Sequence, residues 1–167
     1  SFRVEEFVPD RIKVTAKLDK PFLLPGQSAQ LTINAQNFFG PPAANRNYEY
    51  EVQLRQKSFS SNKYNQYSFG IDNTTISFDK LMEEGKTDET GSAVKSYTVP
   101  ATFKNTGVLQ ANFYATVFDE TGRPVSKSTN ADIFTQEVFL GIALEGYWYQ
   151  PLNKTVRSTL IALDKDE

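Results

Sequence analysis

The sequence predicts an all-β fold: an antiparallel immunoglobulin-like β-sandwich of about seven strands, followed by a partial C-terminal β segment. Three observations carry this prediction. Apolar and polar residues alternate with a period of two along several segments, turn signals rich in Gly, Pro and Asp separate those segments, and no convincing helix interrupts them. The 13 Phe and 8 Tyr residues also supply bulky partners that suit packing between sheets.

The first two strands are predicted at residues 12–18 and 29–36, with a Pro25-Gly26 turn before the second. Core-facing positions alternate with polar ones in both segments: Ile12, Val14, Ala16 and Leu18, then Ala29, Leu31, Ile33 and Ala35. Pro41 and Pro42 end the second strand, because proline has no N–H to donate to a sheet.

The middle of the chain carries a weaker pattern. A third strand is predicted at 48–54, and the serine-rich stretch 58–65 is interpreted as a surface loop. Short strands are expected at 67–71 and 75–78. The segment 80–85 is consistent with either one helical turn or an irregular sheet edge.

Two identical tetrapeptides, Asp88-Glu89-Thr90-Gly91 and Asp119-Glu120-Thr121-Gly122, predict two type I turns. Asp at the first position bonds the local backbone, and Gly at the fourth tolerates a positive φ. Strands are predicted beside them at 93–99, 109–117 and 129–135, the second of these showing the clearest alternation in the chain.

These patterns divide the chain into three parts. Residues 1–9 are interpreted as a linker from a preceding domain, and residues 10–137 as the complete sandwich. Residues 138–167 are too few to build a core, so they are either the start of the next β domain or extra strands. Because their apolar face would otherwise be exposed, we expect them to self-associate or to dock on the sandwich.

Composition excludes several kinds of chemistry. The sequence has no Cys and no His, so these residues supply no disulfide, thiolate or imidazole. The formal net charge of -2 and the absence of a basic run argue against a nucleic-acid partner. No apolar run approaches the ~20 residues that span a bilayer, so direct membrane insertion is not expected.

The acidic side chains of the two repeated turns, Asp88, Glu89, Asp119 and Glu120, are the first candidates for a site. They could form a glycosidase pair or offer oxygens to calcium. The favoured interpretation is that each Asp caps its own turn. The Ser and Lys residues near 57–58 and 126–128 are interpreted as solvated turns. No catalytic, cofactor-binding or metal site is therefore assigned, and no cofactor is expected.

The aromatic residues Tyr147, Trp148 and Tyr149 form the candidate interface. With Tyr64 and Tyr67 they could be a sugar-stacking platform. Adjacent strand residues face opposite sides, so Tyr147 and Tyr149 would share a face from which Trp148 points away. A mixture of core and rim positions, or contact with a neighbouring domain, is the favoured interpretation.

Several stretches resemble the macroglobulin-like domains of bacterial α2-macroglobulins. They are the linker-like residues 2–9, the aromatic-Gly-Pro turn at 38–46, the turn at 85–91, the hairpin at 117–125, and the pair 139–142 and 160–164, which resembles the start of the following, bait-carrying domain. Each is mainly turn chemistry, so their order and spacing carry the resemblance.

The resemblance implies a structural, non-enzymatic module of a protease trap, an endopeptidase inhibitor of the bacterial cell envelope or periplasm. Its partners would be the adjacent domains and, through the full-length protein, proteases. The chain departs from the complete family because it has no cysteine and so cannot contain the Cys-Gly-Glu-Gln thioester. The alternative function is a carbohydrate-binding or adhesion module of a surface protein; a small glycosidase is the enzymatic rival.

Overall fold

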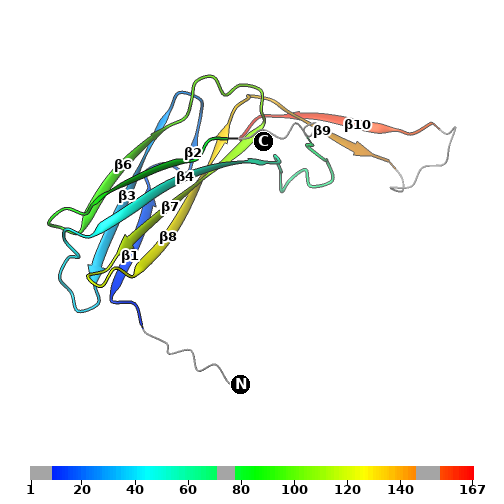
Figure 1. Cartoon of the computed structure of the whole chain (residues 1–167). Helices are drawn as coiled ribbons and strands as arrows, with labels where there is room; N and C mark the ends of the chain where they lie inside the picture. Colours follow the sequence, from blue (N-terminus) through cyan, green and yellow to red (C-terminus); the bar gives the residue numbers. More distant parts are fainter. Residues whose placement is uncertain (1–8, 71–77, 146–154) are drawn as a thin grey trace, which may run out of the picture.

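The computed structural model describes residues 9–70, 78–145 and 155–167, drawn in colour in Figure 1. In these residues the secondary structure is entirely β. The strands are β1 (Ile12–Leu18), β2 (Phe22–Leu23), β3 (Ser28–Asn37), β4 (Asn47–Lys57), β5 (Leu81–Lys86), β6 (Ser92–Thr98), β7 (Val108–Phe118), β8 (Pro124–Phe134), β9 (Phe139–Leu144) and β10 (Ser158–Leu163). None of the described segments forms a helix suited to crossing a membrane.

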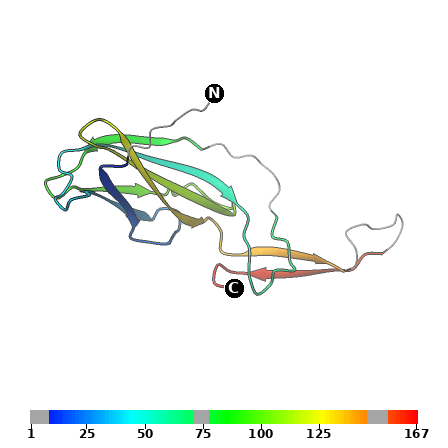
Figure 2. The ribbon, with the colours of Figure 1, turned by 90° about the horizontal axis from the view of Figure 1, so that it is seen from below.

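Two sheets pack face to face and confirm the predicted sandwich (Figures 1 and 2). One sheet has the order β1-β3-β6 and the other the order β2-β8-β7-β4-β5. Neighbouring strands are antiparallel except for β2, which pairs with β8 in parallel through Phe22↔Asp132 and Leu23↔Ile133. Sequence reasoning missed β2, because two residues are too few to show alternation.

The core lies between the inward faces of these two sheets. Alternation along β1, β3, β4 and β7 places every second side chain inside, as predicted. The largest fully buried side chains include Tyr50, Phe113, Ile12, Leu31 and Leu109. Burial of each contributes about 1.5–3 kcal/mol in transfer free energy, so this face, rather than any polar group, holds the module together.

Of the two alternatives for 80–85, the sheet edge is confirmed and the helical turn is wrong, because Leu81–Lys86 forms the edge strand β5. The reason is tertiary: β4 offers a free edge, and β5 pairs with it from Asn47↔Lys86 to Val52↔Leu81. The ring of Tyr48 covers Gly85, its partner across the strands, where an added β-carbon would lie 2.6 Å from the phenol oxygen. Gly85 therefore leaves room for that ring.

The stretch 58–70 is irregular but not simply a surface loop. Phe59 and Ser61 are buried, contrary to the expectation from its polar composition. Of the strand predicted at 67–71, the described part forms only an isolated bridge between Ser68 and Ile142. The prediction at 75–78 falls largely on residues 71–77, outside the described residues.

Strands β9 and β10 form a separate antiparallel hairpin that projects from one end of the sandwich (Figure 2). One face packs in a second apolar cluster: Phe59, Phe69, Val108, Phe139 and Leu163. Phe59 and Phe139 stack there with ring centroids 4.2 Å apart. The expected docking on the sandwich thus occurs through this face. The opposite face leaves Leu140, Ile142, Leu144 and Leu160 exposed, and self-association through it stays a prediction.

Candidate functional site at one end of the sandwich

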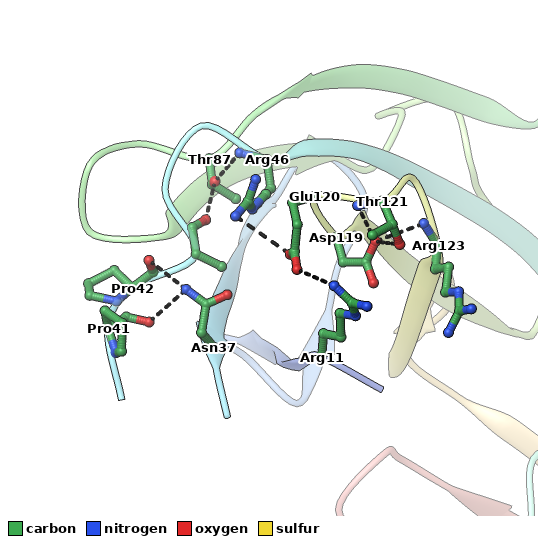
Figure 3. Close-up of polar contacts among 11 residues, drawn as sticks. Arg11, Asn37, Pro41, Pro42, Arg46, Thr87, Asp119, Glu120, Thr121 and Arg123 are labelled. Carbon is green, nitrogen blue, oxygen red and sulfur yellow. Dashed lines mark hydrogen bonds and ion pairs between the residues drawn. The ribbon is translucent and has the colours of Figure 1, made fainter. Parts of the chain in front are cut away.

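The polar contacts of Figure 3 gather at the end of the sandwich where the chain enters β1. Four segments meet there: residues 9–11, the loop 38–46 between β3 and β4, the turn 87–91 before β6, and the turn 119–123 between β7 and β8. These segments come from both sheets, so contacts among them fix one sheet against the other at this end.

Glu120 pairs with two arginines, of which Arg11 links it to the other sheet (Figure 3). Its Oε1 accepts a hydrogen bond from Nη1 of Arg11, just before β1, at 3.0 Å. Its Oε2 lies 3.7 Å from Nη2 of Arg46, just before β4. The pKa of Glu120 is lowered, first by a hydrogen bond from its own backbone and then by Arg11. Exposed pairs of this kind add little stability, so their effect here is to orient the loops.

Thr87 joins the loop 38–46 to the turn before β6. Its buried hydroxyl donates to the carbonyl oxygen of Ala43 at 2.7 Å and accepts the backbone N–H of Arg46 at 2.9 Å. The backbone N–H of Thr87 also donates to the Arg46 carbonyl. Sequence reasoning missed Thr87, because an isolated threonine before a turn gives no signal of burial.

The loop after β3 is held by Asn37. Its side-chain amide donates to the carbonyl oxygens of Pro41 at 3.1 Å and Pro42 at 3.2 Å, as Figure 3 shows. The backbone N–H of Phe38 donates to the carbonyl oxygen of Arg11, which ties the loop to the entering chain. Two phenylalanines, Phe38 and Phe39, stand at its tip with 59% and 99% of their surface exposed.

The repeated turns have the predicted capping geometry. Oδ1 of Asp119 accepts from the Thr121 hydroxyl at 2.7 Å, the Thr121 N–H at 2.8 Å and the Arg123 N–H at 3.0 Å. Asp88 makes the same three contacts in its own turn, with Thr90 and Ser92. Both carboxylates are therefore engaged by their own backbone, which favours the capping interpretation over a catalytic pair.

These hydrogen bonds lower the pKa of both aspartates. The N–H of Ser92 and the hydroxyl of Thr90 lower the pKa of Asp88. At Asp119, burial raises the pKa, but the Thr121 hydroxyl and the backbone donors outweigh it, so the pKa is lowered overall. Both groups are anions at neutral pH. In the described part of the chain, no group of three or more acidic side chains is arranged to hold a metal ion.

Two open concave surfaces flank the Glu120 bridge. One, of about 770 Å³, is polar and is lined by Arg46, Glu49, Glu84, Lys86 and Asp119, among others. The other, of about 1070 Å³, is lined by Pro9, Asp10, Arg11, Phe38, Phe39, Pro41 and Glu120, among others. The second brings together the exposed phenylalanines and the point of chain entry, a juxtaposition that the sequence did not reveal.

The predicted interface residues Tyr147, Trp148 and Tyr149 lie outside the described residues. Tyr64 and Tyr67, the other members of the hypothetical sugar platform, pack edge to face with centroids 6.3 Å apart and join the second apolar cluster. They therefore pack against the apolar cluster of the β9–β10 hairpin and do not form an open stacking surface.

Fold and site together define a modular β-sandwich whose polar residues fasten loops. A family model, the Bacterial Alpha-2-macroglobulin MG5 domain, matches residues 10–134, and the chain belongs to this family. Relatives include an Alpha-2-macroglobulin homolog of Nostoc, 30% identical over 93 residues, and one of Yersinia pestis, 28% identical over 151 residues. These matches cover 52% and 86% of this chain but only 5% and 7% of the relatives.

Solved structures show the same fold. Escherichia coli alpha-2-macroglobulin activated by porcine elastase matches with a TM-score of 0.70 and 19% identity, over 95% of this chain and 14% of that one. Its native conformation matches with a TM-score of 0.67 and 17% identity, over 96% and 11%. The chain thus spans a small fraction of the length of the proteins it resembles.

Proposed function

We propose that this chain is a scaffold module of a bacterial α2-macroglobulin-like endopeptidase inhibitor and performs no chemistry of its own. The observation that carries the proposal is the match of residues 10–134 to the MG5 domain of that family. The described site agrees with it, because Asp88 and Asp119 cap turns and Glu120 pairs with arginines. A rigid module of this kind would hold the neighbouring domains at fixed positions relative to each other.

The remaining parts of the proposal concern the full-length protein. Its partners are the adjacent domains and the captured protease, and its compartment is extracytoplasmic, the periplasm or cell envelope. The thioester of the family would lie elsewhere in the protein, because this sequence has no cysteine. Residues 1–9 serve as the linker from the preceding domain.

Residues 138–167 are proposed to open the next β domain. The family match ends at residue 134. A two-stranded hairpin is marginally stable alone, and here one face of β9 and β10 exposes Leu140, Ile142, Leu144 and Leu160. Further strands packing on Leu140, Ile142 and Leu160 would complete a core of which the present chain holds only a part.

The test is protease inhibition by the full-length protein, measured as protection of a protein substrate. We expect inhibition by the wild type, a large loss in Gly91→Val, which breaks the fold of this module, and near-normal inhibition in Gly122→Ser. Full inhibition by Gly91→Val with the module unfolded would contradict a scaffold role. Binding of a glycan by the full-length protein, lost on Trp148→Ala, would favour the carbohydrate-binding alternative.

A further inference from the structure

The two phenylalanines at the tip of the β3–β4 loop are unusual for a protein surface. Phe38 is 59% exposed and Phe39 is 99% exposed, and they lie next to each other. Single apolar side chains on a surface need no explanation, but adjacent large ones lining a concave surface mark an interaction site. Pro41 and Pro9 extend that surface, so half of the residues that line it are apolar.

The loop presents these rings in a fixed conformation. Asn37 bonds two proline carbonyls, and the side chain of Gln36 donates to the carbonyl oxygen of Gly40 at 2.9 Å. Gly40 has a φ of 109°, a conformation that glycine adopts readily and other residues rarely do. A loop ordered in advance loses little conformational entropy when a partner covers it, which favours binding.

The same loop is fastened to the segment through which the chain enters the sandwich. The N–H of Phe38 donates to the carbonyl oxygen of Arg11 at 3.2 Å, and Pro9 and Asp10 line the concave surface beside the rings. The point at which the chain enters the sandwich, Pro9, therefore lies beside Phe38 and Phe39.

We propose that Phe38 and Phe39 form the docking surface for the domain that precedes residue 9 in the full-length protein. The inference rests on the proposed function, since it requires this chain to be one module of a longer one. In the proposed function residues 1–9 are the linker to that domain, and a linker of this length spans at most about 30 Å even when fully extended. A domain tethered so closely has a high effective concentration at this surface, so a small apolar contact is enough to keep it occupied.

The charged residues around the rings, Asp10, Arg11 and Glu120, argue against a phosphate-rich partner. Arg11 and Glu120, which line the same surface, neutralise each other at 3.0 Å. The surface therefore lacks the uncompensated positive charge with which proteins bind phosphate-rich partners. The contact is expected to bury the rings against apolar side chains of the preceding domain, with the Arg11–Glu120 pair at its rim.

The first test is hydroxyl-radical footprinting of the full-length protein, followed by mass spectrometry of the peptide that contains Phe38 and Phe39. We expect both rings to be labelled several-fold more slowly than in the urea-unfolded protein, at every protein concentration. Labelling at the unfolded rate overturns the proposal. Protection that disappears on roughly 100-fold dilution identifies a second copy as the occupant and also overturns it.

The second test compares Phe38→Ser/Phe39→Ser with Val94→Ser in the full-length protein. Val94 on β6 is as exposed as Phe38, at 59%, and serves as a control outside the concave surface. We expect the double variant to be cleaved in residues 1–9 about fivefold faster by added protease, because the domains separate more often. The control is expected to match the wild type. Equal rates in all three proteins overturn the proposal.

These experiments distinguish a failure of the docking surface from a failure of the proposed function. A full-length protein that inhibits proteases while Phe39 is freely labelled retains the proposed function and loses the docking surface. A protein that protects Phe39 but inhibits no protease retains the docking surface and loses the proposed function.

Discussion

The carbonyl oxygen of Ala35 lies 2.3 Å from the position that a β-carbon on Gly91 would occupy. The backbone N–H of Ala35 also donates to the Gly91 carbonyl at 2.8 Å, so the turn before β6 is pressed directly against β3. Gly122, the last residue of the identical tetrapeptide, has a similar φ, but nothing lies within 4 Å of its position. Two copies of one local motif therefore meet different tertiary surroundings.

Gly91→Ala is expected to destabilise the chain by about 2–4 kcal/mol, since a strained positive φ and a backbone clash add together. Gly122→Ala is expected to cost only about 1 kcal/mol, for the positive φ alone. Urea denaturation of both variants measures the difference. Equal losses would mean that β3 moves aside without cost.

Tyr50 carries a buried hydroxyl without a hydrogen-bond partner in the described part of the chain. Burial, aided by the charge of Glu83, raises the pKa of Tyr50 well above its ordinary value, so the phenol stays neutral. Because an unbonded buried hydroxyl is costly, we expect Tyr50→Phe to be neutral or to stabilise by about 1 kcal/mol in thermal and urea unfolding. Tyr114→Phe, on the outer face, should change nothing. A clear loss in Tyr50→Phe would show that the hydroxyl is bonded.

Acid should reduce the stability that the turns capped by Asp88 and Asp119 contribute to the folded chain. The folded chain holds Asp88 and Asp119 at lowered pKa values, so the unfolded chain takes up protons first as the pH falls. This contribution to stability is present above the unfolded pKa of about 3.9 and is lost as the pH falls through the folded values. Asp88→Asn/Asp119→Asn should therefore show a smaller drop in Tm from about pH 5 to 3 than the wild type. Parallel drops in the two proteins would contradict this account.

Only one face of the β9–β10 hairpin packs in the second apolar cluster. Phe139 is 2% exposed and stacks on Phe59, whereas its neighbour Leu140 is 70% exposed. Phe139→Ala is expected to speed hydrogen exchange at the amide of Ile142, which donates to the Ser68 carbonyl, and to leave the sandwich core protected. Leu140→Ala should leave this exchange unchanged in the 167-residue chain. Loss of protection throughout β7 in Phe139→Ala would show that hairpin and sandwich unfold together.

Strands with strict alternation were predictable from sequence, and so were the two turns. Residues 109–117 place Leu109, Phe113 and Val117 inside as expected, and Asp119 caps its turn as expected. Period-two burial and Asp–Gly turn chemistry are properties of adjacent residues, so the chain displays them locally. The burial of Phe59 was not predictable, and at 80–85 the sequence left a sheet edge and a helical turn open. Each outcome depends on a partner distant in sequence: Phe139 and β4.

The sequence by itself determined the all-β class, the inward face of each long strand and the capping role of Asp88 and Asp119. Tertiary structure alone decided that Arg11, Arg46 and Glu120 meet, and that Phe38 and Phe39 stand beside the point of chain entry. Local patterns follow from the steric and hydrogen-bonding preferences of neighbouring residues. Contacts between the ends of different strands follow only from how two sheets stack, which no short segment of the chain encodes.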